Sequence, residues 1–164
     1  MPYAVIMRFP WWALIACLGA QVVSGQATSR GLSVKMVAEV EVRPDQAGHE
    51  AKLAPADRVV PGDEVIYTVE IRNASALAIP APAVAIAIPA HTVYVAESAS
   101  GPGASVSYSI DGGHTFDGAE SLQVSEGGHE RPATPKDYTH IRWTLKNTLK
   151  PKSIAFARFR AVVK

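Results

Sequence analysis

The chain has 164 residues, of which 48% are hydrophobic, 7% aromatic and 19% charged. This length suits one domain, and this composition can bury a core, which excludes a disordered chain, a collagen and a coiled coil. A single cysteine excludes an intrachain disulfide framework and any cysteine-based zinc site, and 16 basic against 15 acidic side chains give no reason to expect nucleic acid or an anionic membrane as a partner.

The first segment has the pattern of a secretory signal peptide. Arg8 precedes an apolar run over residues 9–20, which is shorter than the roughly 20 residues that a membrane span needs. The small residues at 25–27 match a signal peptidase site. We therefore expect residues 1–27 to be removed, a mature chain that begins at Thr28 without a transmembrane helix, and a secreted or periplasmic location.

Cys17 leaves a second possibility open. Residues 14–17 read Leu-Ile-Ala-Cys, which resembles the bacterial lipobox, whose cysteine is lipidated and becomes the first mature residue. A lipid anchor at Cys17 would hold the protein at a membrane. Mass spectrometry of the mature N-terminus separates the two outcomes.

The following chain alternates with the period of a β-strand. Residues 32–42 place apolar side chains at every second position, and residues 65–72 do the same after a turn at Pro61, Gly62 and Asp63. Shorter strands are expected at 84–88, bracketed by prolines, at 92–96 and at 106–110, with a weak strand at 122–124 and an irregular polar loop at 126–137. The last two strands are expected at 138–145 and 154–163.

Seven or eight short strands without a helical stripe predict an antiparallel β-sandwich of the immunoglobulin-like type, formed by residues 28–164 as a single domain. The alternation assigns Ala155, Ala157, Phe159, Ala161 and Val163 to one face of the last strand. The predicted core centres on four side chains, which are Tyr67, Val69, Trp143 and Phe159.

Charge is unevenly distributed along the mature chain. Residues 28–130 hold 6 basic and 14 acidic side chains, whereas residues 131–164 hold 9 basic ones and one acid, Asp137. Two explanations stay open: acidic neighbours within the domain complement the basic strands, or the basic strands form a docking face. The first and last strands of immunoglobulin-like folds lie close together, so we expect the outward pair Glu39 and Glu41 beside Arg158 and Arg160.

The sequence Val-Pro-Gly-Asp-Glu-Val-Ile-Tyr-Thr-Val-Glu-Ile-Arg-Asn at residues 60–73 resembles the opening of the domain of unknown function eleven, the "conserved repeat domain" of bacterial surface proteins. Residues 86–89 followed by Tyr94 look like its proline-containing turn, and residues 143–151 look like its last hairpin. The resemblance covers roughly residues 32–164. It implies an immunoglobulin-like fold in an exported or envelope protein without known catalysis.

A second motif lies at residues 109–116. The spacing Ser109-x-Asp111-x-Gly113-x-Thr115-Phe116 is similar to the Asp-box, which recurs in hairpins of sialidases and other sugar-acting proteins. The residue types suit a structural hairpin, because an aspartate can accept backbone N–H bonds across a turn and glycine can adopt a positive φ. We therefore expect these residues to be structural.

Motifs for enzyme chemistry are missing from the sequence. It contains no Gly-x-Ser-x-Gly elbow, no His-Glu-x-x-His helix and no phosphate-binding glycine loop. The five histidines are widely spaced, so we expect no catalytic residue, no metal and no cofactor; they are His49, His91, His114, His129 and His140.

The function expected from these signals is that of an exported, non-catalytic module of the bacterial envelope, structural or protein-binding. Its partner would be an envelope protein or polysaccharide that the sequence does not identify. The alternative is a small secreted glycan-binding or carbohydrate-active protein that uses the Asp-box-like hairpin. A patch of exposed aromatic side chains would favour the alternative, and the candidates for it are Tyr94, Tyr108 and Phe116.

Overall fold

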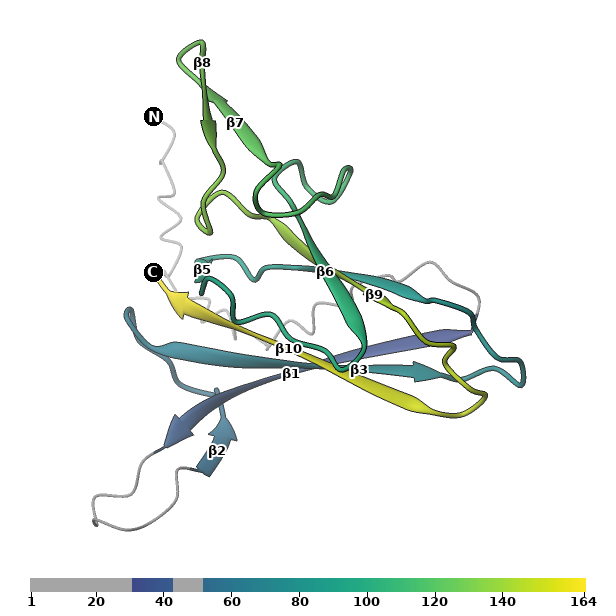
Figure 1. Cartoon of the computed structure of the whole chain (residues 1–164). Coiled ribbons are helices and arrows are strands. Elements are labelled where there is room, and N and C mark those ends of the chain that lie inside the picture. The colour runs from purple at the N-terminus through teal and green to yellow at the C-terminus, as the bar shows by residue number, and fades with distance from the viewer. Residues whose placement is uncertain (1–30, 43–51) are drawn as a thin grey trace, which may run out of the picture.

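The structure, a computed structural model, describes residues 31–42 and 52–164. This part of the chain forms ten strands and no helix, against the seven or eight strands predicted (Figure 1). Accordingly, no membrane-spanning helix is found among these residues. The predicted leader at 1–27, with Cys17, lies outside them. The strands are β1 (Leu32–Val42), β2 (Lys52–Pro55), β3 (Glu64–Asn73), β4 (Ala83–Ala87), β5 (Thr92–Tyr94), β6 (Ala104–Ser109), β7 (Gln123–Glu126), β8 (His129–Pro132), β9 (His140–Leu145) and β10 (Ile154–Val163).

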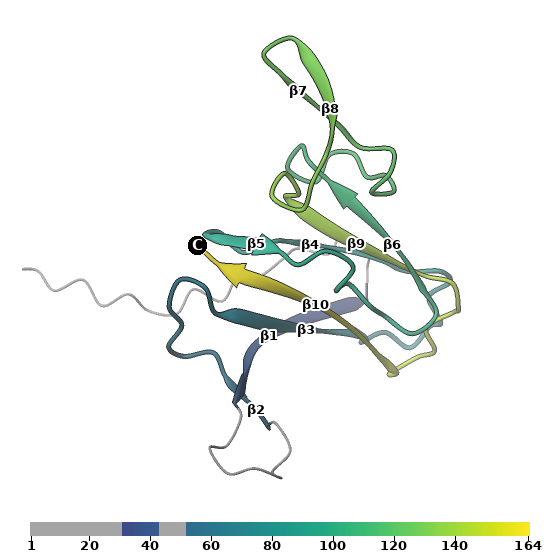
Figure 2. The ribbon, with the colours of Figure 1, turned by 60° about the vertical axis from the view of Figure 1, so that its left-hand side comes forward.

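Two antiparallel sheets form the body of the fold, which confirms the predicted β-sandwich. One sheet has the order β2-β1-β3-β10-β5 and the other β4-β9-β6, while β7 and β8 pair only with each other. Figure 2 shows the three-stranded sheet lying over the five-stranded one. Buried side chains from both sheets join in one hydrophobic core.

The alternation in the sequence sets which side of each strand faces this core. In the pairing of β1 with β3, Val34 lies opposite Ile71 and Met36 opposite Val69, so the apolar rows of both strands coincide. The same holds between β3 and β10, where Tyr67 lies opposite Phe159. Because side chains alternate with period two, the intervening residues of all three strands point outward.

An aromatic contact joins the two sheets. Trp143 of β9 and Phe159 of β10 are fully buried, with ring centroids 6.0 Å apart, although these consecutive strands belong to different sheets. Phe159 also stacks on Tyr67 at 4.9 Å. With Val69, which is fully buried as well, all four predicted core side chains lie in the core.

Three tyrosines form a second aromatic cluster. Tyr108 stacks on Tyr138 with ring centroids 4.6 Å apart, and its hydroxyl lies 3.0 Å from that of Tyr94. The Tyr94 hydroxyl also accepts the backbone N–H of Ala99 at 3.0 Å. Burial, aided by the bond to Tyr94, raises the pKa of Tyr108 far above the usual tyrosine range.

The strand order corrects one prediction. The first long strand and the last are not neighbours, because β3 lies between β1 and β10. Arg160 therefore pairs with Glu64 of β3 at 2.7 Å, and the Arg158 guanidinium donates to the Thr68 hydroxyl at 3.2 Å. The expected adjacency of Glu39 and Glu41 to the last strand is wrong.

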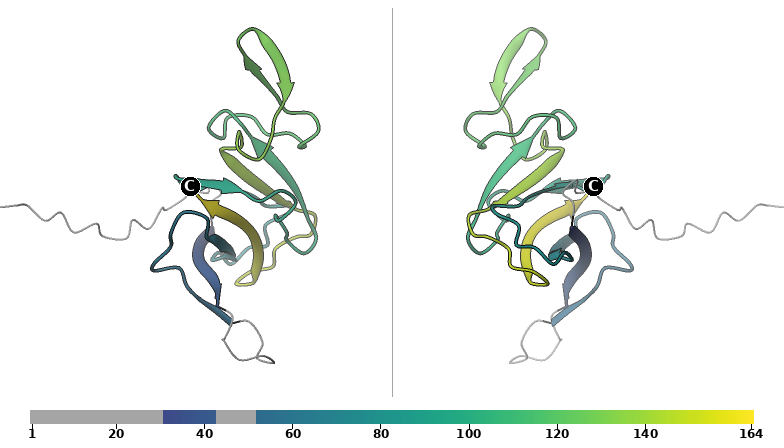
Figure 3. Two further views of the ribbon diagram at one scale, coloured as in Figure 1. Left: turned by 90° about the vertical axis from the view of Figure 1, so that its left-hand side faces the viewer. Right: turned by 90° about the vertical axis from the view of Figure 1, so that its right-hand side faces the viewer.

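A hairpin replaces the irregular loop predicted at 126–137. Strands β7 and β8 meet at Gly127 and Gly128, which have φ values of 61° and 81°, as a tight two-residue hairpin requires. Arg131 fixes the base of the hairpin through two bonds to Asp137, at 2.8 and 2.9 Å, and one to Glu126 at 2.9 Å. The hairpin projects away from both sheets (Figures 1 and 3).

Trp143 offers a test of the core. Trp143→Ala should lower the free energy of unfolding by about 3–5 kcal/mol, because it leaves a large cavity between the sheets. Trp143→Phe should cost less than half of that, since the indole Nε1 is buried without a hydrogen-bond partner and its loss leaves no other group unpaired. Denaturant unfolding measures both values, and equal losses for the two variants would contradict this packing.

Candidate functional site

The Asp-box-like segment forms a closed hydrogen-bonded loop after β6. The Asp111 carboxylate accepts the Thr115 hydroxyl at 2.6 Å, the Ser109 hydroxyl at 2.7 Å, and the backbone N–H groups of His114 and Thr115 at 3.0 Å. These bonds, first the one from the Thr115 hydroxyl, hold the pKa of Asp111 well below its usual range. The carboxylate thus organises its own loop.

Position 113 of this loop favours glycine for two separate reasons. Its φ is +88°, and a Cβ atom at this position would lie 3.2 Å from the His140 ring. Its N–H donates to the Ser109 hydroxyl at 2.9 Å, and Ser109 itself is fully buried. Burial, the largest influence, lowers the pKa of His140. These contacts favour the structural interpretation of the motif.

The three aromatic candidates for a sugar-binding patch do not form one. Phe116 is half-buried, with the Arg142 guanidinium carbon 4.4 Å from its ring centroid. Tyr94 is buried, and Tyr108 is half-buried in the tyrosine cluster. An exposed aromatic side chain lies elsewhere, at Phe156.

The predicted turn at residues 61–63 precedes β3 and is hydrogen-bonded to the end of β10. Asp63 accepts the backbone N–H of Val60 at 2.8 Å through its carboxylate, which closes the turn. Gly62 has a φ of +98°, and its N–H donates to the carbonyl of Val163 at 2.9 Å. Val163 returns its N–H to the carbonyl of Asp63 at 2.9 Å. Pro61 is exposed beside Gly62.

The surface with the most features for binding is the solvent side of the five-stranded sheet, which we call the outer face. Phe156 is 54% exposed there, and Val37 and Ile154 are also exposed. Acidic and basic side chains surround these apolar groups. The outer face comprises Lys35, Val37, Glu39 and Glu41 of β1, Glu64, Ile66, Thr68, Glu70 and Arg72 of β3, and Ile154, Phe156, Arg158, Arg160 and Val162 of β10.

A groove of about 460 Å³ lies beside Phe156. Ser100 and Arg158 exchange two backbone hydrogen bonds of 2.8 Å, which bring the segment after β5 alongside β10. This segment forms one wall of the groove, which is lined by Thr68, Ser100, Pro102, Phe156, Ala157 and Arg158.

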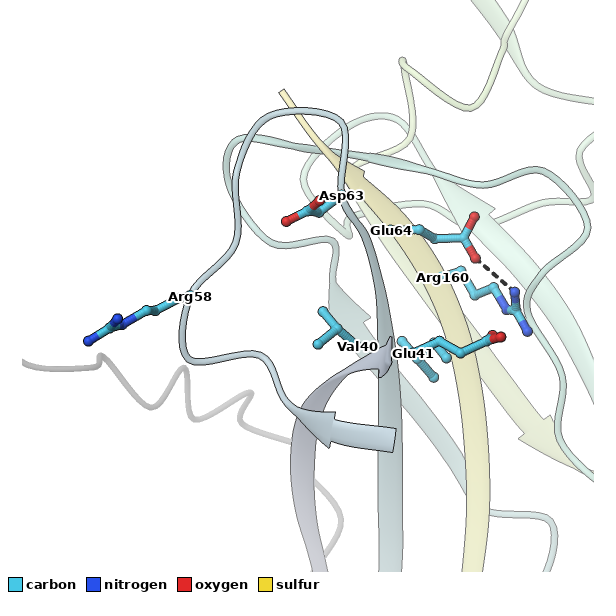
Figure 4. A pocket seen from close by; sticks show the side chains of 7 residues that line it. Val40, Glu41, Arg58, Asp63, Glu64 and Arg160 are labelled. Carbon is cyan, nitrogen blue, oxygen red and sulfur yellow. Dashed lines mark hydrogen bonds and ion pairs between the residues drawn. The ribbon is translucent and has the colours of Figure 1, made fainter. Parts of the chain in front are cut away.

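A second groove, of about 680 Å³, lies at the other end of the outer face (Figure 4). The ion pair of Glu64 and Arg160 crosses from β3 to β10 on one side of it, while the Arg58 side chain points away from the sheet. Its lining combines both signs of charge with aliphatic groups and consists of Val40, Glu41, Arg58, Asp63, Glu64, Ile66 and Arg160.

Sequence reasoning missed Phe156, although the signal was present. The alternation that turns Phe159 inward turns the residues at 156, 158 and 160 outward, and only the two arginines were assigned to that side. His114 lies close enough to His140 to influence its charge, but no three potential metal ligands come together in this part of the chain. The expectation of no metal or cofactor stays a prediction.

Comparisons with models of protein families, with curated proteins and with solved structures found no match. The resemblance to the domain of unknown function eleven thus stays a prediction that depends on the residues quoted for it. What this chain binds has to be inferred from its own surface.

Acidification tests the role of Asp111. A carboxyl whose pKa is lower in the folded state contributes stability above its unfolded pKa and loses it as the pH falls toward the folded value. We expect the unfolding free energy to decrease below about pH 4, and Asp111→Asn to make that decrease shallower. Asp57→Asn, which removes an exposed aspartate outside the loop, is the control. Identical pH profiles for all three proteins would contradict the loop's role.

Proposed function

We propose that this chain is an exported, non-catalytic, immunoglobulin-like module of the bacterial envelope that binds a partner protein through its outer face. The signal-peptide pattern over residues 1–27 and the resemblance to bacterial surface domains support the location. A mature chain that begins at Thr28 contains no cysteine, which suits an oxidising compartment.

One observation carries the binding role, which is the exposure of Phe156 at the edge of a groove on the outer face. Aromatic side chains and arginine are enriched in the cores of protein interfaces, where they contribute most of the binding energy. Phe156 is a neighbour of Arg158 on the same side of β10. The phenyl ring can serve as the anchor, and Arg158 can supply a charged contact at its side.

The charges around this anchor suit recognition of a protein. The outer face carries four acidic and four basic side chains, and ion pairs join Arg72 to Glu70 and Arg160 to Glu64. Such a mixed pattern fixes the orientation of a partner and rejects others, rather than attracting any anion or cation. We therefore favour a folded protein as the partner over a charged polymer.

Site-specific photo-crosslinking tests this proposal. A photoreactive residue at position 156 should capture one defined envelope protein, whereas the same residue at the exposed position Glu120, away from the outer face, should not. The purified partner should then bind the Phe156→Ser variant at least about tenfold more weakly than the wild type. Equal capture at both positions, or unchanged affinity of the variant, would reject the outer face as the site.

A glycan array distinguishes the proposed protein-binding module from the alternative, a glycan-binding protein. Binding to a sugar that Asp111→Ala abolishes, while the unfolding midpoint stays unchanged, would favour the glycan-binding protein instead. Mass spectrometry of the mature N-terminus tests export in the same preparation, because Thr28 and a lipidated Cys17 have different masses.

A further inference from the structure

One buried amide organises the end of the sandwich where β3 ends and β10 begins. Asn73 is fully buried, and its Nδ2 donates to the carbonyl oxygens of Leu77 at 2.7 Å, Leu149 at 3.0 Å and Lys150 at 3.1 Å. Ile79 and Leu149 exchange two backbone bonds of 3.0 and 2.9 Å. The loops at 74–82 and 146–153 are thus joined, side by side at the right of Figure 1.

These loops hold a leucine in solvent. The Leu77 side chain is 76% exposed, the highest value among the large hydrophobic residues that the structure describes. Its backbone is fixed on both sides, because its N–H donates to the Ser75 hydroxyl at 3.2 Å and its carbonyl accepts from Ser75 at 2.9 Å and from Asn73. These bonds hold the backbone of the loop in the position that exposes the side chain.

The two joined loops carry charge of one sign. Lys146, Lys150 and Lys152 are exposed in the second loop, and the Lys152 ammonium donates to the carbonyl of Ala74 at 2.5 Å. Residues 71–90 and 138–164 contain no aspartate or glutamate. We call this surface, Leu77 with these three lysines, the lysine end. It contrasts with the balanced charges of the outer face.

The chain enters the sandwich at the same end. The carbonyl of Gly31, the first residue that the structure describes, accepts the N–H of Ala74 at 2.7 Å, and Leu32 lies opposite Asn73. The apolar run at residues 9–20 therefore precedes the lysine end by only ten residues of sequence. A chain that is still attached to a membrane through this run, or through Cys17, would be attached at the same end of the sandwich as the lysines.

We propose that the lysine end binds the surface of an anionic lipid bilayer, with Leu77 inserted at the boundary of the acyl chains and the lysines against the headgroups. A soluble polyanion would need the lysines but not an exposed leucine on the adjoining loop, whereas both features favour binding to a bilayer. The inference rests on the proposed function for the export of the protein to the bacterial envelope, but it concerns a different surface and a different ligand.

Vesicle binding tests the proposal on the protein purified in its processed form. We expect flotation with vesicles of equal parts phosphatidylglycerol and phosphatidylcholine, none with phosphatidylcholine alone, and release by salt because lysine–headgroup attraction is screened. Leu77→Ser should weaken binding about tenfold, and Lys150→Gln roughly fivefold. Lys152 is left unchanged because it also holds the loop.

Two matched controls lie away from this end. Val60→Ser removes an aliphatic side chain that is 62% exposed at the opposite end of β3, and Lys136→Gln removes an exposed lysine near the β7–β8 hairpin. Both should bind vesicles like the wild type. Equal binding to both kinds of vesicle, or losses in the controls as large as in the Leu77 and Lys150 variants, would overturn the proposal.

A fluorescent variant reports the insertion itself. Leu77→Trp should shift its emission to the blue on anionic vesicles and be quenched by brominated lipids. Capture by dextran sulfate with equal affinity for the wild type and Leu77→Ser, without such quenching, would show a polyanion site and refute bilayer binding. Export is read separately from the N-terminus, so the proposed function and this inference can fail independently.

Discussion

The contact between Trp143 and Phe159 fixes the rest of the structure, because it joins two consecutive strands that lie in opposite sheets. Phe159 also stacks on Tyr67, so β10 is set against both β9 and β3. Since side chains alternate with period two, turning Phe159 inward turns Phe156 and its neighbouring arginines outward. A slip of one residue in β10 would bury the arginines and expose the core. The composition of the outer face is therefore a consequence of how the core packs.

Alternation predicted the long strands and the buried side of each, because that signal is local. It could not predict their order, since pairing depends on contacts between distant segments. The position of β3 between β1 and β10 is such a case, as is the short polar hairpin at residues 123–132, whose base depends on the bonds from Arg131 to Asp137. In the sequence, Asn73 is merely the residue that follows the strand expected at 65–72. Its role appears only when residues 149 and 150, 76 and 77 positions later, come into hydrogen-bond distance.

The uneven charge along the sequence has a different explanation in each part of the fold. Some basic groups are complemented within the domain, as Arg160 is by Glu64 and Arg131 by Glu126 and Asp137. An exposed ion pair such as that of Arg160 and Glu64 contributes about 0–1 kcal/mol, so it organises a surface more than it stabilises the fold. The lysines of the loop at 146–153 differ, because the neighbouring chain segments contain no acid. A net charge near zero thus conceals one balanced face and one basic end.

The two proposed surfaces are compatible in space because one lies beyond the ends of the strands and the other lies along one side of them. The lysine end is formed by loops, so a bilayer bound there would meet the sandwich at the ends of β3 and β10. The outer face follows the length of those strands, so Phe156 points away from the side of the sheet rather than from the strand ends. The Asp-box-like loop begins at the far end of β6. Groups that share no contact contribute nearly additively. A protein held at the membrane by one surface can therefore bind a second protein through the other without a change of fold.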